Sequence, residues 1–234
     1  MAFFDIDGTI IWRTSKSGVN LKSSCFNHAL KAVFGLDGVS YLTILGKKIY
    51  GQTDRSILRL TLLELGYTDD DYYQNEEKLF AEVDNYFEKY QRKLQYGEYK
   101  RIDGAFEILE MLQNKNIRLG LVTGNIKKHS DWKMMGVGYD RFFTTGGFGD
   151  DGESRDDIMR TALERNNDIP SDRICHFGDS PQDITAARNF NLKVVAICDI
   201  GGGTHTRDEL EKFNYGLVVD SWYEIDLIVS YLNS

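Results

Sequence analysis

The sequence predicts an α/β fold, a doubly wound parallel sheet with an all-helical segment inserted after the first strand. From residue 104 onward, short apolar runs that end in Gly, Thr or Asp alternate with segments of helical periodicity. This alternation is typical of parallel strands joined by right-handed helical crossovers. Residues 15–95 instead keep helical periodicity and carry no strand pattern. A helical insertion therefore separates the first strand from the rest of the sheet.

The composition is that of an ordinary globular protein with an excess of acidic residues. The 234 residues, 27% charged and 41% hydrophobic, have room for one large domain with an insertion. The net charge of −8 disfavours nucleic acid or an anionic membrane as the main partner. Three widely spaced cysteines indicate a reducing compartment. Because no apolar run approaches the roughly 18 residues of a membrane span and no signal peptide precedes the first strand, we expect a cytoplasmic protein.

The first strand ends in two aspartates. The run Phe3–Ile10 is typical of a short buried strand, yet it carries Asp5 and Asp7. Ionised carboxylates are costly to desolvate unless they are paired or hold a metal. They favour a functional site at the carboxyl end of a central strand, where open α/β sheets bind ligands. A polar Asp-Gly turn at Asp7 is the alternative interpretation.

We expect a Rossmann-like core made of residues 1–14 and 96–234, and a helical domain over residues 15–95. The segment Ile11–Val19 has no clear period and is expected to be a linker, whereas Ser40–Tyr50 is ambiguous. Three helices are expected in the insertion: Leu21–Phe34, a second that begins after the N-cap Thr53, and Asp70–Leu94.

The later part of the chain carries the remaining strands of the predicted sheet. They are expected at Ile117–Val122, near Arg141–Phe143, and at Arg173–Phe177, Lys193–Ile197 and Tyr215–Val219. Between and after them, helices are expected at Ala105–Lys115, Ile126–Met135, Arg155–Asn166, after Ser180, and at Trp222–Leu232.

Polar groups follow three of the predicted strands. Asp5 and Asp7 follow the first, Thr123 follows the second, and Asp179 and Asp183 follow a third. Since parallel strands share one carboxyl edge, these side chains can meet. Four converging carboxylates would repel one another without a cation, and their hard oxygens suit Mg²⁺. Mg²⁺ favours phosphate oxygens as further ligands. The hydroxyl and the backbone N–H of Thr123 could donate hydrogen bonds to the same phosphate.

These residues resemble the haloacid dehalogenase-like hydrolases. The run Asp5–Thr9 is similar to the first motif of that family, Thr123 to the second, and Gly178–Asp183 to the fourth. The helical insertion resembles the cap of the phosphoglycolate phosphatase-like subgroup, in which a Gly-x-Thr-Asp run like Gly51–Asp54 is also typical. The match covers essentially the whole chain.

The resemblance implies a role for each matching residue. Asp5 would be the nucleophile that forms an aspartyl-phosphate, and Asp7 the general acid and base. Thr123 and the N–H of Gly124 would orient phosphoryl oxygens. Mg²⁺ would be held by the Asp5 side chain, the Asp7 backbone carbonyl and Asp179, with Asp183 supporting through hydrogen bonds or water.

The third motif of the family usually supplies a lysine, and this chain offers Arg155 instead. An arginine keeps the charge and binds phosphate bidentately. The alternatives are a solvated first-turn arginine, with Lys127 or Lys128 as the cation. In the insertion, we expect Thr53 and Arg55 to face the substrate, because a helix N-terminus favours anions.

The expected activity is Mg²⁺-dependent hydrolysis of a small phosphorylated metabolite, phosphoglycolate-like or a sugar phosphate, by a monomer or homodimer. Asp7 favours phosphoryl transfer over dehalogenation, because dehalogenases of this fold need no acid or base at that position. Two alternatives stay open at this point. One is a phosphomutase acting on a sugar phosphate, and the other is a catalytically silent binding protein.

Overall fold

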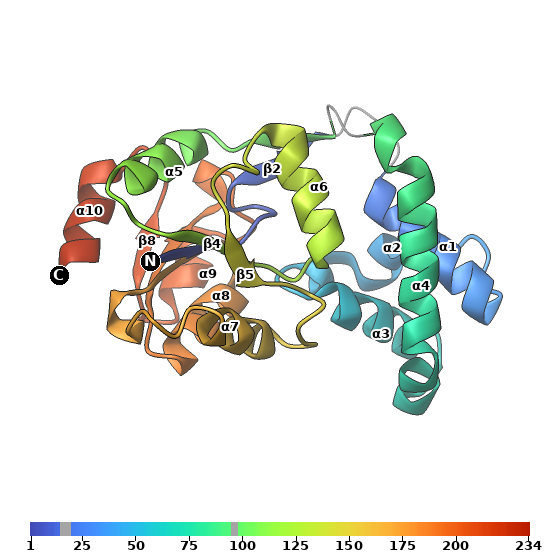
Figure 1. Ribbon diagram of the computed structural model, residues 1–234. Helices are drawn as coiled ribbons and strands as arrows, with labels where there is room; N and C mark the ends of the chain where they lie inside the picture. Colours follow the sequence, from blue (N-terminus) through green and yellow to red (C-terminus); the bar gives the residue numbers. More distant parts are fainter. Residues whose placement is uncertain (15–19, 95–97) are drawn as a thin grey trace.

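The computed structural model describes residues 1–14, 20–94 and 98–234, which form an α/β body with a helical unit at one end (Figure 1). In the described residues the main sheet is six-stranded, and each strand pairs in parallel with its neighbours. This confirms the predicted fold class. In spatial order, the strands are β5 (Thr145–Gly147), β4 (Leu119–Val122), β1 (Ala2–Phe4), β6 (Cys175–Gly178), β7 (Lys193–Ile197) and β8 (Leu217–Val219).

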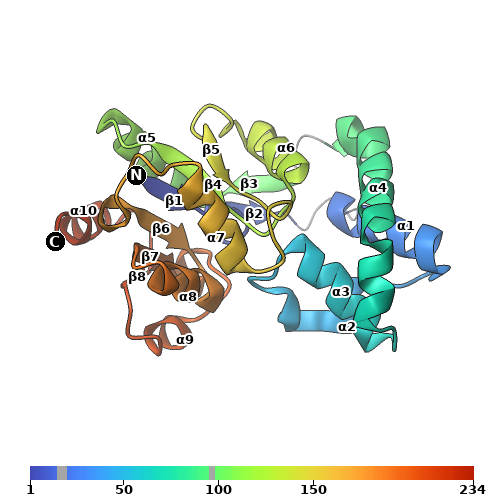
Figure 2. The same cartoon turned by 60° about the horizontal axis from the view of Figure 1, so that its bottom comes forward.

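Helices cover both faces of the sheet, so β1 is buried from both sides (Figure 2). Successive side chains of a strand point to opposite faces. Phe4 accordingly packs in the cluster that includes α5 (Ala105–Asn114), α6 (Lys127–Val137) and α10 (Ile225–Asn233). Phe3 packs in the cluster on the other face, formed with α7 (Arg155–Glu164), α8 (Pro181–Asn189) and α9 (Arg207–Glu211).

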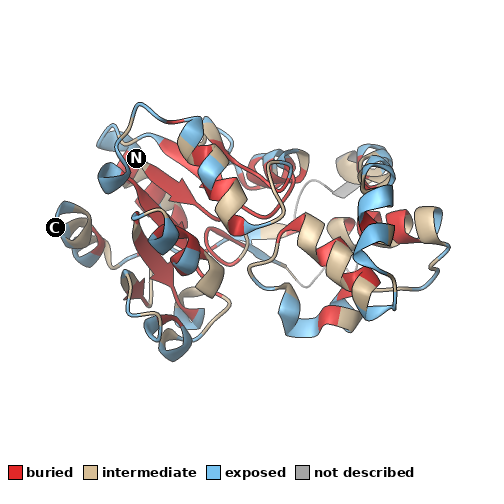
Figure 3. Ribbon diagram, turned by 90° about the horizontal axis from the view of Figure 1, so that it is seen from below, coloured by how far each residue is buried: buried red, intermediate tan, exposed pale blue. Residues whose placement is uncertain are grey.

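The inserted segment is helical and has a hydrophobic cluster of its own, visible as the buried inner stripes of its helices (Figure 3). Ile126 and Trp132, at the beginning of α6 and within it, pack into that cluster from the α/β body. The unit is thereby joined to the body through apolar contacts. Its elements are α1 (Leu21–Phe34), α2 (Tyr41–Leu45), the 3₁₀ turn Gly46–Ile49, α3 (Asp54–Glu64) and α4 (Asp69–Leu94).

A small antiparallel ribbon lies where the chain leaves and re-enters the α/β body. It consists of β2 (Ile11–Arg13) and β3 (Tyr99–Arg101), with Trp12 opposite Lys100. The expectation of a linker from Ile11 is therefore wrong for its first residues, because a partner 88 residues away supplies the pairing. The rest of that linker and both expected domain boundaries fall on or beside residues 15–19 and 95–97, outside the described residues, and the domain division stays a prediction.

One predicted strand is displaced. The apolar residues Phe142 and Phe143 precede the edge strand and pack in the core, whereas β5 is the glycine-containing stretch that follows them. At Gly147 a Cβ atom would lie 2.2 Å from the carbonyl oxygen of Ile158, so the close approach of α7 requires glycine. Apolar patterning cannot reveal a strand that is selected for small residues.

Trp222 connects the C-terminal segment to the loop after β1. Its indole is fully buried, packs against Phe177 with the two rings tilted to each other, and donates to the carbonyl oxygen of Thr9 at 2.7 Å. We expect Trp222→Ala to lower the free energy of unfolding by about 3–5 kcal/mol, measured by urea denaturation. Its neighbour Tyr223 is exposed, so Tyr223→Ala should change that free energy by less than about 0.5 kcal/mol. If the two substitutions lowered the free energy of unfolding equally, Trp222 would not be the stabilising contact between the C-terminal segment and the loop after β1.

Candidate active site

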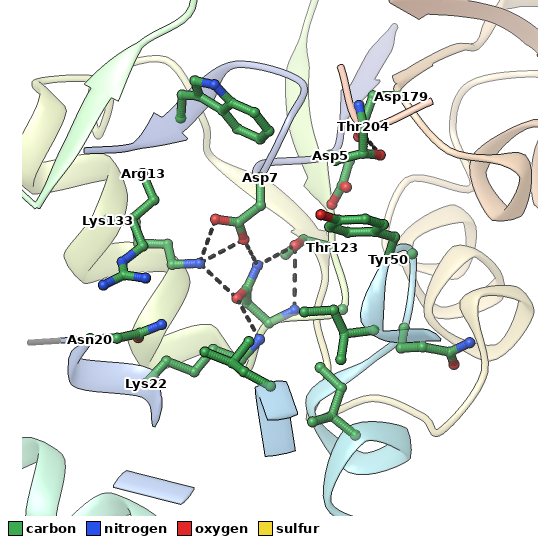
Figure 4. Close-up of a pocket in the computed structure, with 18 of the residues that line it drawn as sticks. Asp5, Asp7, Arg13, Asn20, Lys22, Tyr50, Thr123, Lys133, Asp179 and Thr204 are labelled. Carbon is green, nitrogen blue, oxygen red and sulfur yellow. Dashed lines mark hydrogen bonds and ion pairs between the residues drawn. The ribbon is translucent and has the colours of Figure 1, made fainter. Parts of the chain in front are cut away.

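The carboxyl ends of the central strands open into a pocket of about 350 Å³ between the α/β body and the helical unit. Figure 4 shows Asp5 and Asp179 on one side of this pocket, and Asp7 with Lys133 on the other. The body and the unit both contribute to its lining. Among the lining residues are Thr123, Gly124, Arg155 and Thr204 from the body, and Lys22, Tyr41, Tyr50 and Gln52 from the unit.

An acidic cluster occupies the first side of the pocket. Asp5, Asp179 and Asp183 are buried, and each offers an oxygen within 4.8 Å of the others. Asp179 accepts hydrogen bonds from the hydroxyl of Thr9 at 3.0 Å and from the N–H and hydroxyl of Thr204. Burial raises the pKa of Asp5 and Asp179, and the nearby charge of Asp183 adds to the effect on both.

Asp183 is held by the first turn of α8. Ser180 is the N-cap of this helix. A carboxylate oxygen of Asp183 accepts from the N–H and the hydroxyl of Ser180, which completes a capping box. The other carboxylate oxygen contacts Nε2 of the buried His176 at 2.9 Å. Although burial opposes its charge, Arg155 and His176 hold the pKa of Asp183 below its usual value. Asp183 is thus a fixed negative charge whose oxygens already have protein partners, which suits a supporting position beside Asp5 and Asp179.

Arg155 supplies the positive charge in contact with the cluster. It is 7% exposed although it begins α7, and its guanidinium lies 3.3 Å from Asp5 and 3.5 Å from Asp183. It is therefore not a solvated first-turn residue. The other two candidate cations point elsewhere, because Lys127 pairs with Asp131 and Lys128 with acidic residues of α4.

The acidic cluster fits a hard divalent cation. Arg155 contributes one positive charge against three buried carboxylates, so negative charge is in excess. The donors are carboxylate oxygens, the ligand type preferred by Mg²⁺. Asp5 and Asp179 both line the pocket, so a cation held by them would also be accessible to a ligand there. The residues present therefore match the expected cofactor in charge and in donor chemistry.

Asp7 belongs to a second cluster, built around Lys133. The Lys133 ammonium lies 2.8 and 2.6 Å from the two Asp7 oxygens and is only 3% exposed. The Asn125 amide donates to the same carboxylate at 2.8 Å. Burial opposes ionisation of Asp7, but Lys133 outweighs it and lowers the pKa of the carboxyl. Asp7 nevertheless keeps 44% of its side-chain surface accessible and remains open to a ligand.

Sequence reasoning missed Lys133 and Thr204. Lys133 lies on the buried face of α6 with Ser130, Met134 and Val137. The sequence feature that could have identified it is a single lysine at a helical position that faces the core. Such a residue calls for a buried partner. Thr204 follows the Gly201–Gly203 loop, and no spacing connects it to Asp179, 25 residues earlier.

The two residues of the helical unit expected to face the substrate bind the α/β body instead. The hydroxyl of Thr53 donates to the carbonyl oxygen of Glu153 at 2.8 Å and caps α3. Arg55 donates to the carbonyl oxygen of Gly149 at 3.1 Å and pairs with Glu76 of α4. Neither is among the residues lining the pocket. Their polarity serves to dock α3 against the 146–153 loop.

Comparison with known proteins agrees with this arrangement. The sequence model of the haloacid dehalogenase-like hydrolases matches residues 2–197. The chain belongs to this family. Among curated proteins, the "Putative pyrophosphatase PpaX" of Clostridium perfringens is 28% identical over 241 residues, which cover 99% of this chain and 97% of that protein. The predicted family and the prediction of a hydrolase are thereby confirmed.

Solved structures of haloacid dehalogenase-like proteins share the fold. A "predicted phosphoglycolate phosphatase" from Haemophilus somnus aligns with a TM-score of 0.67 at 19% identity, over 98% of this chain and 97% of its own. CbbY from Rhodobacter sphaeroides, solved in complex with phosphate, aligns with a TM-score of 0.67 at 20% identity, over 96% and 95%. Within the described part of this chain, no helix combines the length and apolarity needed to cross a membrane.

Removing the Arg155 charge should destabilise the protein, because it leaves the acidic cluster without its contacting guanidinium. We expect Arg155→Met to lower the free energy of unfolding by about 3–5 kcal/mol at neutral pH, measured by urea denaturation. Arg160 is the matched control, since it lies on the same helix, is exposed, pairs with Asp157 and lies over the ring of Phe190. Arg160→Met should cost less than about 0.5 kcal/mol. If both variants unfold alike, the cluster does not need Arg155.

Proposed function

We propose that this protein is a Mg²⁺-dependent phosphatase that hydrolyses a small phosphomonoester through an aspartyl-phosphate on Asp5. One observation carries the proposal. One pocket is bordered by the buried carboxylate of Asp5, the carboxylate of Asp7 two residues later, the loop at Thr123 whose donors suit a phosphate, and the Arg155 guanidinium. The family membership and a related structure solved with phosphate support phosphoryl chemistry.

The Asp5 carboxylate is the nucleophile of the first step. It attacks phosphorus, a new O–P bond forms, and the bond to the leaving oxygen breaks. The hydroxyl of Thr123 accepts two hydrogen bonds from Asn125 and keeps its own proton to donate to a phosphoryl oxygen. The N–H of Gly124 and the Arg155 guanidinium provide further donors around the same group. When bound, Mg²⁺ would be held by Asp5 and Asp179 and would neutralise charge on the phosphoryl oxygens.

Asp7 moves the protons. In its acid form it gives its proton to the departing alkoxide, which leaves as an alcohol, and the resulting carboxylate is stabilised by Lys133 and Asn125. That carboxylate then takes a proton from the water that attacks the phosphorus of the aspartyl-phosphate. Phosphate is released, Asp5 is regenerated and Asp7 is again protonated. The contacts of Asp7 favour its ionised form, the state between these two steps.

The helical unit acts as a cap in this proposal. It supplies about half of the pocket lining, including Tyr41, Tyr50 and Lys22, opposite the catalytic edge of the sheet. Enclosure by the cap excludes bulk water and selects the leaving group. The aromatic and basic residues it contributes suit a small polar metabolite with some apolar surface.

Asp5→Asn is the direct test of the nucleophile. We expect it to lower kcat for p-nitrophenyl phosphate by at least about three orders of magnitude, because an amide cannot form the aspartyl-phosphate. Asp70→Asn, at an exposed position of α4, should leave kcat unchanged. The assay should release inorganic phosphate, whereas a mutase supplied with a sugar phosphate and a bisphosphate primer would produce the isomer. Full activity in Asp5→Asn would refute the proposal.

Metal removal tests the acidic cluster independently of turnover. We expect a chelator to abolish hydrolysis and Mg²⁺ to restore it. Because a ligand that binds only the folded state stabilises it, Mg²⁺ should also raise the melting temperature of the wild type and of Asp70→Asn. It should not raise that of Asp179→Asn, which loses a carboxylate of the cluster. A melting temperature that responds equally in all three proteins would place the ion elsewhere.

A further inference from the structure

We propose that Asn125 is a positioning residue for Asp7, and that Lys22 of the helical unit fixes the orientation of its side-chain amide. The inference rests on the proposed function, since it assigns Asp7 the proton that the leaving group receives. Neither Asn125 nor Lys22 belongs to the motifs by which the sequence resembles its family. What connects them to the reaction is their hydrogen bonding.

The surroundings of the Asn125 amide determine which way it faces. Its oxygen accepts from the Lys133 ammonium at 2.9 Å and has the Lys22 ammonium at 3.5 Å. Its nitrogen donates to Asp7 at 2.8 Å and to the hydroxyl oxygen of Thr123 at 2.8 Å. A flipped amide would point its oxygen at the Asp7 carboxylate and its N–H groups at two ammonium groups, neither of which can form the hydrogen bond.

This arrangement gives Asn125 a function that Lys133 alone does not provide. An ammonium attracts a carboxylate but imposes little direction on it, since its three donors rotate freely. The planar amide of Asn125 adds a directed hydrogen bond to one Asp7 oxygen. Because Asn125 also contacts Thr123, it fixes the proton donor relative to the loop that holds the phosphoryl group. With Asn125 only 4% exposed, little room remains for another side-chain position.

Lys22 links this amide to the helical unit. It lies on α1 and forms an ion pair with Asp54, the fully buried first residue of α3. Asp54 in turn accepts from the N–H of Ile126 at 3.0 Å and donates its own N–H to the carbonyl oxygen of Gly124 at 2.8 Å. The same two residues of the unit therefore contact both the backbone and the side chain of the Thr123–Ile126 loop. Correct docking of the unit is thus coupled to the position of Asp7.

The test compares two substrates that differ in their need for a proton. Nitrophenolate leaves as a stable anion, whereas the alkoxide of propyl phosphate must be protonated as it departs. The parameter is kcat/KM, which reports the steps up to departure of the leaving group. General acid catalysis contributes about 10²–10⁴-fold, so Asn125→Ala should lower kcat/KM for propyl phosphate at least about tenfold more than for p-nitrophenyl phosphate.

Lys22→Met should change the two substrates in the same unequal way, but by less, because it removes only one of the charges that orient the amide. The matched control is Lys47→Met, an exposed lysine of the same unit, which should change neither value. An equal loss on both substrates in Asn125→Ala would mean a structural role in the loop and would overturn the proposal. An equal rise in KM on both in Lys22→Met would instead make Lys22 a substrate-binding residue.

A crystal structure of Asn125→Ala gives a readout without turnover. We expect the Asp7 carboxylate to leave its present position, which Lys133 and Asn125 define, and an unmoved carboxylate would overturn the proposal. If this variant does not fold, Asn125→Ser and Lys22→Met are subjected to the same comparison. Wild-type turnover distinguishes a failure of the proposed function from a failure of this inference. A wild type that is inactive on every phosphomonoester contradicts the proposed function. An active wild type, together with an Asn125→Ala variant that loses kcat/KM equally on both substrates, contradicts only this inference.

Discussion

The structure depends on holding ionised carboxylates at the buried end of a central strand. Desolvation of such groups is unfavourable, and β1 places Asp5 where helices cover both faces of the sheet. The protein compensates with directed partners: Arg155 for Asp5 and Asp183, Lys133 for Asp7, and two threonines for Asp179. Each partner comes from a different element, so the position of the site depends on the packing of the whole α/β body.

Helix capping places one of these partners, Arg155, and one of the carboxylates, Asp183. Ser154 caps α7 and thereby begins the helix at Arg155, whose side chain is directed inward to Asp5. Ser180 does the same for α8 and uses Asp183 as the third residue of its capping box. The hydrogen bonds that cap the N-terminus of each helix therefore also fix a charged side chain of the site. The acidic side of the pocket is therefore preorganised by the α/β body alone.

The sequence allows the acidic side of the site to be predicted and conceals most of the other side. Asp5, Thr123 and Asp179 are recognisable because each follows an apolar strand, and parallel strands align their carboxyl ends. Lys133 and Asn125 depend on which helix face is buried and on amide orientation, which a single sequence does not display. Thr53 and Arg55 show the reverse error. A polar helix N-terminus suggested an anion site, yet its donors bind the carbonyl oxygens of Glu153 and Gly149.

The two sides of the pocket consequently differ in what they require. Nucleophile, acidic cluster and Arg155 are complete within the α/β body, whereas the surroundings of Asp7 include Lys22 of the helical unit through Asn125. The contact between the two parts is close, since a Cβ atom on Gly124 would lie 2.5 Å from the carbonyl oxygen of Gln52. A shift of the unit would displace Lys22 and Asp54, which contact Asn125 and the backbone of its loop. The acidic cluster and the surroundings of Asp7 are therefore built on separate supports. Docking of the helical unit bears on the second support, through Lys22 and through the contacts of Asp54 with the Thr123–Ile126 loop.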